Sequence, residues 1–373
     1  MKKLIAMLLL LAMLVPCFVA CGGGEKVDNS TDDDTTGNDK GEGNTPGNDE
    51  GEGEGSKTEG STTEGSEVDE NVEPTLTVAE KTALGFEQTT ALEVEFKSTK
   101  DDTLTYTSSD AEVVTIDPAT GVMVGVKEGT ATVTVKNADG TLSATTEVTV
   151  TDPLKGAGAA FCGDSICMAS TWDKDHQWWG WAGRLNRDYE FSVYANKGCD
   201  GASVSNCRKQ NTIVNQVLGL SRSLKLDFLV LHGGVNDGWD KIEVGTIAKD
   251  YEVSSFDVST FAGGLEHLFH TAKRQFPNAK ICYIINFRMN TSVGNLKNMT
   301  PYYQVAKVIC KKWNVPYLDL YDDAEFNSVF DWKTNKYLPD QIHPNSAGYD
   351  VIYPFIARFM RQVKYGIKVN DLK

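Results

Sequence analysis

The stretch LDFLVLHGGVND at residues 226–237 decides the fold. It begins with a mainly apolar run of strand length, residues 226–231, and ends in two glycines, a valine and an Asn-Asp pair. Such a run predicts a strand buried on both faces, as strands of a parallel sheet are. Four more runs of this kind are found at residues 157–162, 191–195, 281–287 and 315–321.

Amphipathic helical patterns separate these strands. Residues 261–275 and 301–313 are two examples, and the last pattern covers about residues 346–363. Alternating strands and helices predict a parallel sheet covered by helices on both faces. We assign this α/β domain to residues 153–373. In such sheets, ligands bind beyond the carboxyl ends of the strands.

Short motifs at these strand ends and in loops carry the groups needed for ester hydrolysis. They are GDS at 163–165, NKGCDG at 196–201, GVND at 234–237 and DQIHP at 340–344. Ser165 needs a base to become a nucleophile. An imidazole is the side chain that changes charge near neutral pH, so a histidine such as His343 can take that proton and later return it to the leaving group. Asp340 can hold the other ring nitrogen and fix the tautomer.

The same motifs offer donors for a developing oxyanion. The backbone N–H of Ser165 is one donor. Gly201 is a second, because its backbone can approach the substrate without a side chain in between. The side-chain amide of Asn236 is the third, since it donates without adding negative charge. Gly198 is the alternative for the second donor, but alignment from Asn196 favours Gly201.

Together these motifs resemble the SGNH, or GDSL, family of serine esterases and lipases over about residues 156–366. The resemblance implies a three-layer α/β/α sandwich, no metal or other cofactor, and hydrolysis through an acyl-enzyme. It implies Ser165 as the nucleophile, Asp340 and His343 as the rest of the triad, and Gly201 and Asn236 as oxyanion donors.

Aromatic residues are frequent near the nucleophile. Trp172 and Trp239, in loops beside the motifs, can form a platform for a sugar ring or an acyl chain, and His176 can face the substrate. For Trp178 and Trp181 we favour packing of the first helix onto the sheet. We see no long apolar lid, so the tryptophans favour a carbohydrate ester over a long-chain lipid.

The sequence does not indicate a catalytic role for the remaining histidines and cysteines. His267 and His270 lie three apart on one predicted helix, but no carboxylate or Cys cluster completes a metal site. We expect His232, at the end of the third strand, to be a packed residue. In an exported protein, Cys199 and Cys207 can form a disulfide, although the pairing does not follow from the sequence.

Residues 1–21 resemble a bacterial lipoprotein signal peptide. Lys2 and Lys3 precede an apolar segment, residues 4–15, that is too short to span a bilayer. The sequence FVACG at 18–22 is similar to a lipoprotein cleavage site, which implies a lipid on Cys21 and anchoring at the extracellular face of a bacterial membrane. Ordinary secretion with cleavage nearby is the first alternative, and an anchor helix is the second.

Most of the net charge of −16 lies in a low-complexity segment, residues 22–74. Residues 22–73 hold 17 Asp and Glu against 3 Lys, a net charge of −14. The segment has little to bury, which predicts a disordered, extended tether. The rest of the chain is close to neutral and shows no basic stripe, so we expect no nucleic-acid partner.

Residues 75–152 alternate with a period of two, which predicts short, half-buried strands. Residues 131–135 and 145–150 are two of them, with a turn at 137–140. Together with YTSSD at 106–110 and EGTA at 128–131, the segment resembles a bacterial immunoglobulin-like domain. The resemblance implies a small all-β sandwich that acts as a spacer or an adhesion module, and we favour the spacer.

These observations predict an exported, membrane-anchored serine esterase that removes short acyl groups, such as acetyl, from carbohydrate. Its partners would be an acylated glycan as substrate and the membrane through Cys21. A lipase, thioesterase or acyltransferase on the same fold is one alternative. A surface protein that binds glycans without catalysis is another.

Overall fold

The computed structural model describes residues 73–98, 103–169, 180–289, 296 and 298–366. The predicted signal peptide, its Cys21 and nearly all of the acidic segment lie outside these ranges. Among the described residues, no helix is both long and apolar enough to cross a membrane.

The N-terminal domain is all-β, as predicted. The expected hairpin is formed by β8 (Gly129–Asn137) and β9 (Ser143–Thr151), which pair antiparallel with Val135 opposite Ala144. Its sheets have the strand orders β2-β9-β8-β5, β3-β7-β6 and β1-β4. The other strands are β1 (Thr75–Val78), β2 (Lys81–Gly85), β3 (Thr89–Ala91), β4 (Val94–Lys97), β5 (Leu104–Ser108), β6 (Val114–Ile116) and β7 (Val122–Gly125).

Alternate side chains of these strands fill a single apolar core. Tyr106 of β5 is buried in it, together with Met123 of β7 and Val133 of β8. Gly121 has a φ of +69°, and a Cβ at this position would lie 2.8 Å from the Tyr106 ring. The turn therefore requires glycine for its backbone conformation and for the space that the tyrosine occupies.

The C-terminal domain contains a five-stranded sheet in which every strand pairing is parallel. Its order is β11-β10-β12-β13-β14. The strands are β10 (Gly158–Cys162), β11 (Val193–Asn196), β12 (Phe228–His232), β13 (Lys280–Ile285) and β14 (Tyr317–Asp319). The chain runs outward from β10 to β11 and then returns to β12 on the other side. Ligands of such sheets bind at this reversal, beyond the carboxyl ends of the strands.

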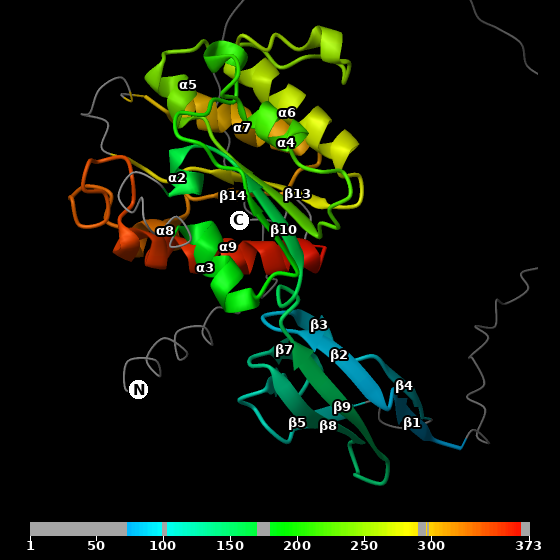
Figure 1. Ribbon diagram of the computed structural model, residues 1–373. Helices are drawn as coiled ribbons and strands as arrows, with labels where there is room; N and C mark the ends of the chain where they lie inside the picture. The colour runs from blue at the N-terminus through cyan, green and yellow to red at the C-terminus, as the bar shows by residue number, and fades with distance from the viewer. Residues whose placement is uncertain (1–72, 99–102, 170–179, 290–295, 297, 367–373) are drawn as a thin grey trace, which may run out of the picture. The chain divides into compact units, whose positions relative to one another are not determined.

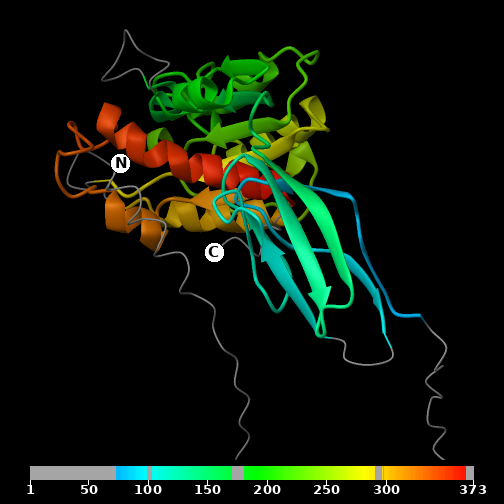
Figure 2. The ribbon, with the colours of Figure 1, turned by 90° about the horizontal axis from the view of Figure 1, so that it is seen from below.

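Helices cover both faces of this sheet, which completes the predicted three layers (Figure 1). One face carries α4 (Ile213–Leu218), α6 (Phe261–Gln275) and α7 (Thr300–Lys312), and the other carries α3 (Trp181–Tyr189) and α9 (Ser346–Lys364). Figure 2 shows α9, in red, crossing the second face of the domain. The short elements are α2 (Ser165–Met168), α5 (Val235–Trp239), α8 (Ala324–Val329) and the 3-10 turns η2 (Asn206–Arg208) and η3 (Val253–Ser255).

The six cysteines in the described part of the chain are all free. Cys199 is exposed and Cys207 half-buried, and no disulfide joins them. The pairing considered from the sequence is therefore not formed in this structure.

Candidate active site

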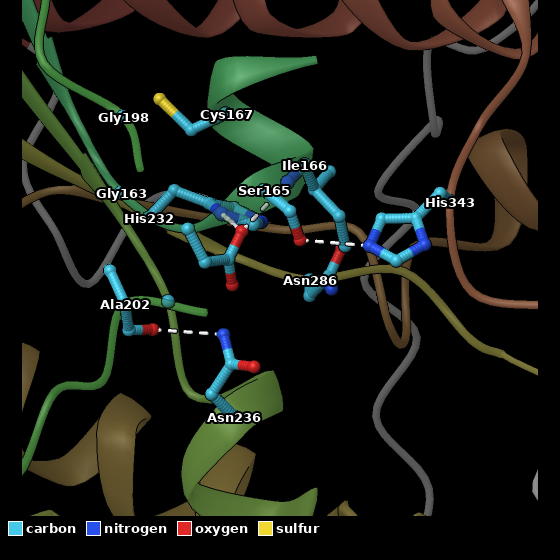
Figure 3. A network of polar contacts seen from close by, with 12 residues as sticks. Gly163, Ser165, Ile166, Cys167, Gly198, Ala202, His232, Asn236, Asn286 and His343 are labelled. Atoms are coloured by element: carbon cyan, nitrogen blue, oxygen red, sulfur yellow. Dashed lines mark hydrogen bonds and ion pairs between the residues drawn. The ribbon is translucent and has the colours of Figure 1, made fainter. Parts of the chain in front are cut away.

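Ser165 is the first residue of α2, which follows β10 after Gly163 and Asp164. The Asp164 side chain caps this helix by accepting a hydrogen bond from the N–H of Ile166 at 3.0 Å. The Ser165 hydroxyl lies 2.8 Å from Nε2 of His343, although 178 residues separate the two in the chain (Figure 3). At this distance the imidazole can take the serine proton directly.

Asp340 holds the other side of the His343 ring. Its Oδ2 lies 2.6 Å from Nδ1, and its Oδ1 accepts the N–H groups of His343 at 2.7 Å and Ile342 at 3.0 Å. Burial raises the pKa of Asp340, but these hydrogen bonds outweigh burial and lower the pKa to about 2. The carboxylate is therefore ionised at neutral pH and can stabilise an imidazolium.

The loop that carries this pair is tightly held. Gln341 has a φ of +73°, a left-handed conformation uncommon for a residue with a side chain. The Asn345 side chain then caps α9 by accepting the N–H of Gly348 at 2.9 Å. The cap and the helix fix the position of His343 beside the nucleophile.

Asn236 lies in the first turn of α5, which follows β12. Its Nδ2 donates to the carbonyl of Ala202 at 2.9 Å, as Figure 3 shows. An amide nitrogen has two N–H groups, so one remains to bind a substrate oxygen. The contact places Asn236 beside the peptide that follows Gly201.

Gly198 does not fit the role of the second donor. Its N–H donates to the Oδ1 of Asn196 at 2.9 Å and is therefore engaged within the loop. A Cβ at Gly198 would lie 2.7 Å from the backbone nitrogen of Met168, so this glycine is needed where the loop packs against α2. Between the two glycines, the geometry favours Gly201.

Residues 161–351, just over half of the chain, match the family model described as GDSL-like Lipase/Acylhydrolase family. The chain belongs to this family. Residues 71–148 match the model of the bacterial Ig-like domain, group 2. The C-terminal domain is therefore a GDSL-like domain that follows an immunoglobulin-like one.

Solved structures similar to the GDSL-like domain have low sequence identity. A protein from Lactobacillus plantarum is 22% identical, with a TM-score of 0.46, and the match covers 55% of this chain and 97% of that one. A protein from Bacteroides ovatus described as a GDSL-like lipase is 18% identical, with a TM-score of 0.42 and coverages of 55% and 98%. A possible lipase from Chitinophaga pinensis is 19% identical, with a TM-score of 0.42 and coverages of 56% and 98%. No curated protein matches the sequence.

Two residues that sequence reasoning missed organise the loop around Gly201 in the GDSL-like domain. Asp237 is fully buried and accepts the N–H groups of Val204 at 2.9 Å and Ser205 at 2.8 Å. Arg208 donates to the carbonyl of Gly201 at 3.0 Å and pairs with both oxygens of Asp240. The Asn-Asp pair in the sequence was a signal for Asp237, whereas nothing local marks Arg208.

Behind the nucleophile, His232 and Asp164 form a buried pair. The His232 Nδ1 lies 3.1 Å from the Asp164 Oδ1, and both side chains are almost inaccessible to solvent. Trp181 is also buried and packs edge-on against Phe161, with ring centroids 5.4 Å apart. The packing roles expected for His232 and Trp181 are confirmed.

The other predicted substrate residues are only partly covered by the structure. Trp239 ends α5, three residues after Asn236, and is 36% exposed. Trp172, His176 and Trp178 lie outside the described residues. His267 and His270 are both on α6, as their spacing predicted. Within the described ranges, no group of three or more His, Cys, Asp or Glu side chains could hold a metal ion.

Proposed function

We propose that this chain is a serine esterase that hydrolyses carboxylic esters through an acyl-enzyme on Ser165. The observation that carries the proposal is the continuous hydrogen-bonded line from Ser165 through His343 to Asp340, with distances of 2.8 and 2.6 Å. These three side chains come from two distant parts of the chain, and the family to which it belongs comprises acylhydrolases.

In the first half of the reaction, the Ser165 oxygen bonds to the ester carbonyl carbon while His343 Nε2 takes the hydroxyl proton. The tetrahedral intermediate collapses as the bond to the alcohol oxygen breaks, and His343 gives its proton to that oxygen. In the second half, water adds to the acyl-enzyme, with its proton passing to His343. The carboxylic acid then leaves, and Ser165 regains its proton.

The negative oxygen of both intermediates is assigned to three donors. They are the backbone N–H of Ser165, the backbone N–H of Gly201 and the side-chain amide of Asn236. The first N–H groups of a helix have no intrahelical acceptor, which leaves that of Ser165 available. Each such donor typically contributes about 3–4 kcal/mol of transition-state stabilisation.

The substrate we propose is a short acyl ester, such as an acetate, on carbohydrate. Trp239, partly exposed three residues from Asn236, supports this assignment because aromatic rings offer an apolar face to a sugar ring. We further propose that the protein is exported and anchored in the membrane by a lipid on Cys21. The apolar segment and the sequence FVACG support that location.

The full chain, purified in detergent, tests the reaction with p-nitrophenyl acetate. We expect hydrolysis that falls about 10³-fold or more in Ser165→Ala, since loss of a triad nucleophile removes the acyl-enzyme route. Equal turnover by the two proteins would refute the mechanism, and if both rates equalled that of the uncatalysed reaction, a surface protein that only binds glycans would be favoured. Faster turnover of p-nitrophenyl octanoate than of the acetate would instead indicate a lipase.

The anchor has a separate test in a bacterial host grown with labelled palmitate. We expect label in the wild-type chain and none in Cys21→Ala, with both proteins exported. Label that persists in Cys21→Ala would show that Cys21 is not the lipidated residue.

A further inference from the structure

In the loop that follows β11, three consecutive backbone carbonyls each accept a hydrogen bond from a different side chain. The carbonyls belong to Asp200, Gly201 and Ala202. Their donors, in the same order, are the side chains of Asn211 at 2.7 Å, Arg208 at 3.0 Å and Asn236 at 2.9 Å. These bonds hold the backbone on both sides of the Gly201 N–H, which is one of the three proposed oxyanion donors.

The bond from Asn211 acts on the Gly201 N–H most directly. A peptide unit is planar and trans, so the Asp200 carbonyl and the Gly201 N–H form one rigid group and point in opposite directions. Holding the oxygen therefore fixes the direction of the N–H. A hydrogen bond to the oxygen also polarises the peptide and strengthens the N–H as a donor, by about 10–30%.

The Gly201 N–H is open to a substrate. Gly201 is half-buried, and its N–H donates to none of the residues that the structure describes. The next N–H along the chain, that of Ala202, is instead engaged by the Cys199 carbonyl at 3.1 Å. An N–H that is fixed in direction but has no internal acceptor suits a developing oxyanion.

The same loop is fastened to both segments that carry the other proposed donors. The Cys199 N–H donates at 3.0 Å to the carbonyl of Gly163, two residues before Ser165. The Ala202 carbonyl accepts the Asn236 amide, as Figure 3 shows. The Gly201 peptide therefore lies between the nucleophile and Asn236.

Asn211 approaches this peptide from a backbone that is itself held. Its N–H donates to the Arg208 carbonyl at 2.9 Å, and its carbonyl accepts the Ser203 N–H at 3.2 Å. Its Nδ2 lies 3.7 Å from the position that a Cβ on Gly201 would take. The amide group is therefore close to Gly201 and has little freedom to move away.

Arg208 holds the following peptide from a guanidinium that is also fixed. Its Nε and Nη2 pair with the two carboxylate oxygens of Asp240 at 2.7 and 2.9 Å, and Nη1 is left to donate to the Gly201 carbonyl. Such two-bond pairs fix the plane of the guanidinium. Asp240 directly follows α5, so this pair joins the loop to the helix of Asn236.

We propose that Asn211 is a positioning residue for ester hydrolysis, which aims the Gly201 N–H at the negative oxygen of the tetrahedral intermediate, while Arg208 fixes the following peptide. The proposal rests on the esterase function above, and both side chains act through Gly201 rather than on the substrate. Loss of an oxyanion donor costs about 10²–10³-fold in kcat, so a donor that is present but misaimed should cost less, about tenfold.

The test compares p-nitrophenyl acetate with its thiono analogue, in which sulfur replaces the carbonyl oxygen, using the full chain. Sulfur is a weak hydrogen-bond acceptor, so the thiono ester depends little on the oxyanion donors. Asn211→Ala should lose about tenfold in kcat/KM for the oxygen ester but only about twofold for the thiono ester. The ratio of the two kcat/KM values should therefore fall about fivefold.

A purely structural role would lower the two rates together and leave this ratio unchanged. Asn211→Leu, which keeps much of the side-chain volume without a donor, should lower the ratio as Asn211→Ala does. Asn215→Ala is the matched control, since the Asn215 amide donates to the Gln210 carbonyl at 3.0 Å, outside the loop of Gly201, and should keep the wild-type ratio.

Arg208→Met should lower the ratio in the same direction. Its control is Arg358→Met, because Arg358 forms a similar two-bond pair with Glu325 and makes no contact with the loop of Gly201. Urea unfolding of each variant shows whether it is folded.

The outcomes separate this proposal from the function on which it rests. No hydrolysis of the oxygen ester by a folded wild-type chain, or equal hydrolysis by Ser165→Ala, would refute the esterase. Hydrolysis that depends on Ser165, with the wild-type ratio retained in folded Asn211→Ala or Asn211→Leu, would refute only the positioning role. An equal fall of the ratio in Asn215→Ala would also overturn it, since the effect would not depend on the contact with Asp200.

Discussion

The Asn236 side chain donates a hydrogen bond to the carbonyl of Ala202 at 2.9 Å, across 34 residues of sequence. It joins the segment after β12 to the loop after β11, and these segments carry two of the proposed oxyanion donors. One side chain thus serves as a donor and also fixes the peptide next to Gly201. Its neighbour Asp237 fastens the same loop at Val204 and Ser205.

Replacing Asn236 with alanine should therefore slow catalysis far more than it weakens the fold. We expect kcat for p-nitrophenyl acetate to fall about 10²–10³-fold, because an oxyanion donor is lost. The free energy of unfolding should fall by only about 1 kcal/mol, the net value of one hydrogen bond. Steady-state kinetics and urea unfolding measure the two effects. A kcat within twofold of wild type would exclude Asn236 from the oxyanion site.

Gly201→Ala tests whether the second donor depends on a glycine backbone. Gly201 has a φ of +72°, and a Cβ there would lie 2.6 Å from an Arg208 guanidinium nitrogen. Gly140 is a matched control, since its φ is +71° and no atom lies within 4 Å of the position that a Cβ would take there. Both variants should lose about 1–2 kcal/mol of stability to the backbone conformation.

Only Gly201→Ala should also lose activity, by about tenfold or more, because Arg208 and the loop must shift to admit the methyl group. The measurements are kcat/KM for p-nitrophenyl acetate and the free energy of unfolding, each compared between the two variants. Equal activity in both variants would show that the Gly201 backbone does not contact the reacting oxygen.

The sequence was informative wherever function depends on residue type and local spacing. The three central strands were predicted to within two residues at each end, since burial on both faces leaves a mainly apolar run. The edge strand β14 covers only Tyr317–Asp319 of the predicted 315–321, because one side has no partner strand to extend pairing. Ser165 and His343 were predicted from their motifs.

What the sequence did not reveal are contacts between distant segments. The pairing of Arg208 with Asp240 and the Gly201 carbonyl joins loops that have no shared local pattern. The buried Tyr303 hydroxyl, which has no hydrogen-bond partner among the described residues, was likewise invisible, because a tyrosine in an amphipathic helix resembles any other core residue. Contacts and burial of this kind can be seen only once the fold has brought the distant segments together.

Asp340 should make stability depend on pH in acid. Its pKa falls from the ordinary value of 3.8 to about 2 in the folded chain, so the unfolded state binds the proton more tightly. The carboxylate therefore stabilises the fold fully above pH 3.8, and this contribution is lost as the pH falls through about 2.

The comparison of wild type with Asp340→Asn, by urea unfolding between pH 6 and pH 2, measures this contribution. We expect the wild-type chain to be more stable at pH 6, with the difference shrinking as the solution is acidified. The variant should also lose about 10⁴-fold in kcat, since the amide favours the wrong imidazole tautomer. A stability difference that is constant with pH would contradict the lowered pKa.

Glu266 anchors the segment after α5 to the helical layer, away from the proposed chemistry. The side chain is fully buried on α6, and its carboxylate pairs with Lys312 at 2.5 Å. It also accepts the N–H of Ala248 at 2.8 Å and the indole N–H of Trp313 at 3.2 Å. Removing the carboxylate would leave these two N–H groups without that acceptor, and the largely buried Lys312 ammonium would keep only the carbonyls of Ala248 and Asp250.

Glu266→Ala should therefore destabilise the chain by about 3–5 kcal/mol, the usual cost of breaking a buried ion pair. Glu325→Ala is the control, because Glu325 is 63% exposed and its pair with Arg358 should contribute at most about 1 kcal/mol. Adding Lys312→Met to Glu266→Ala should restore part of the loss, since it removes the buried positive charge that has lost its counter-charge. An equal loss of stability in the two glutamate variants would contradict the prediction, because it would show that the buried pair with Lys312 contributes no more than the exposed pair with Arg358.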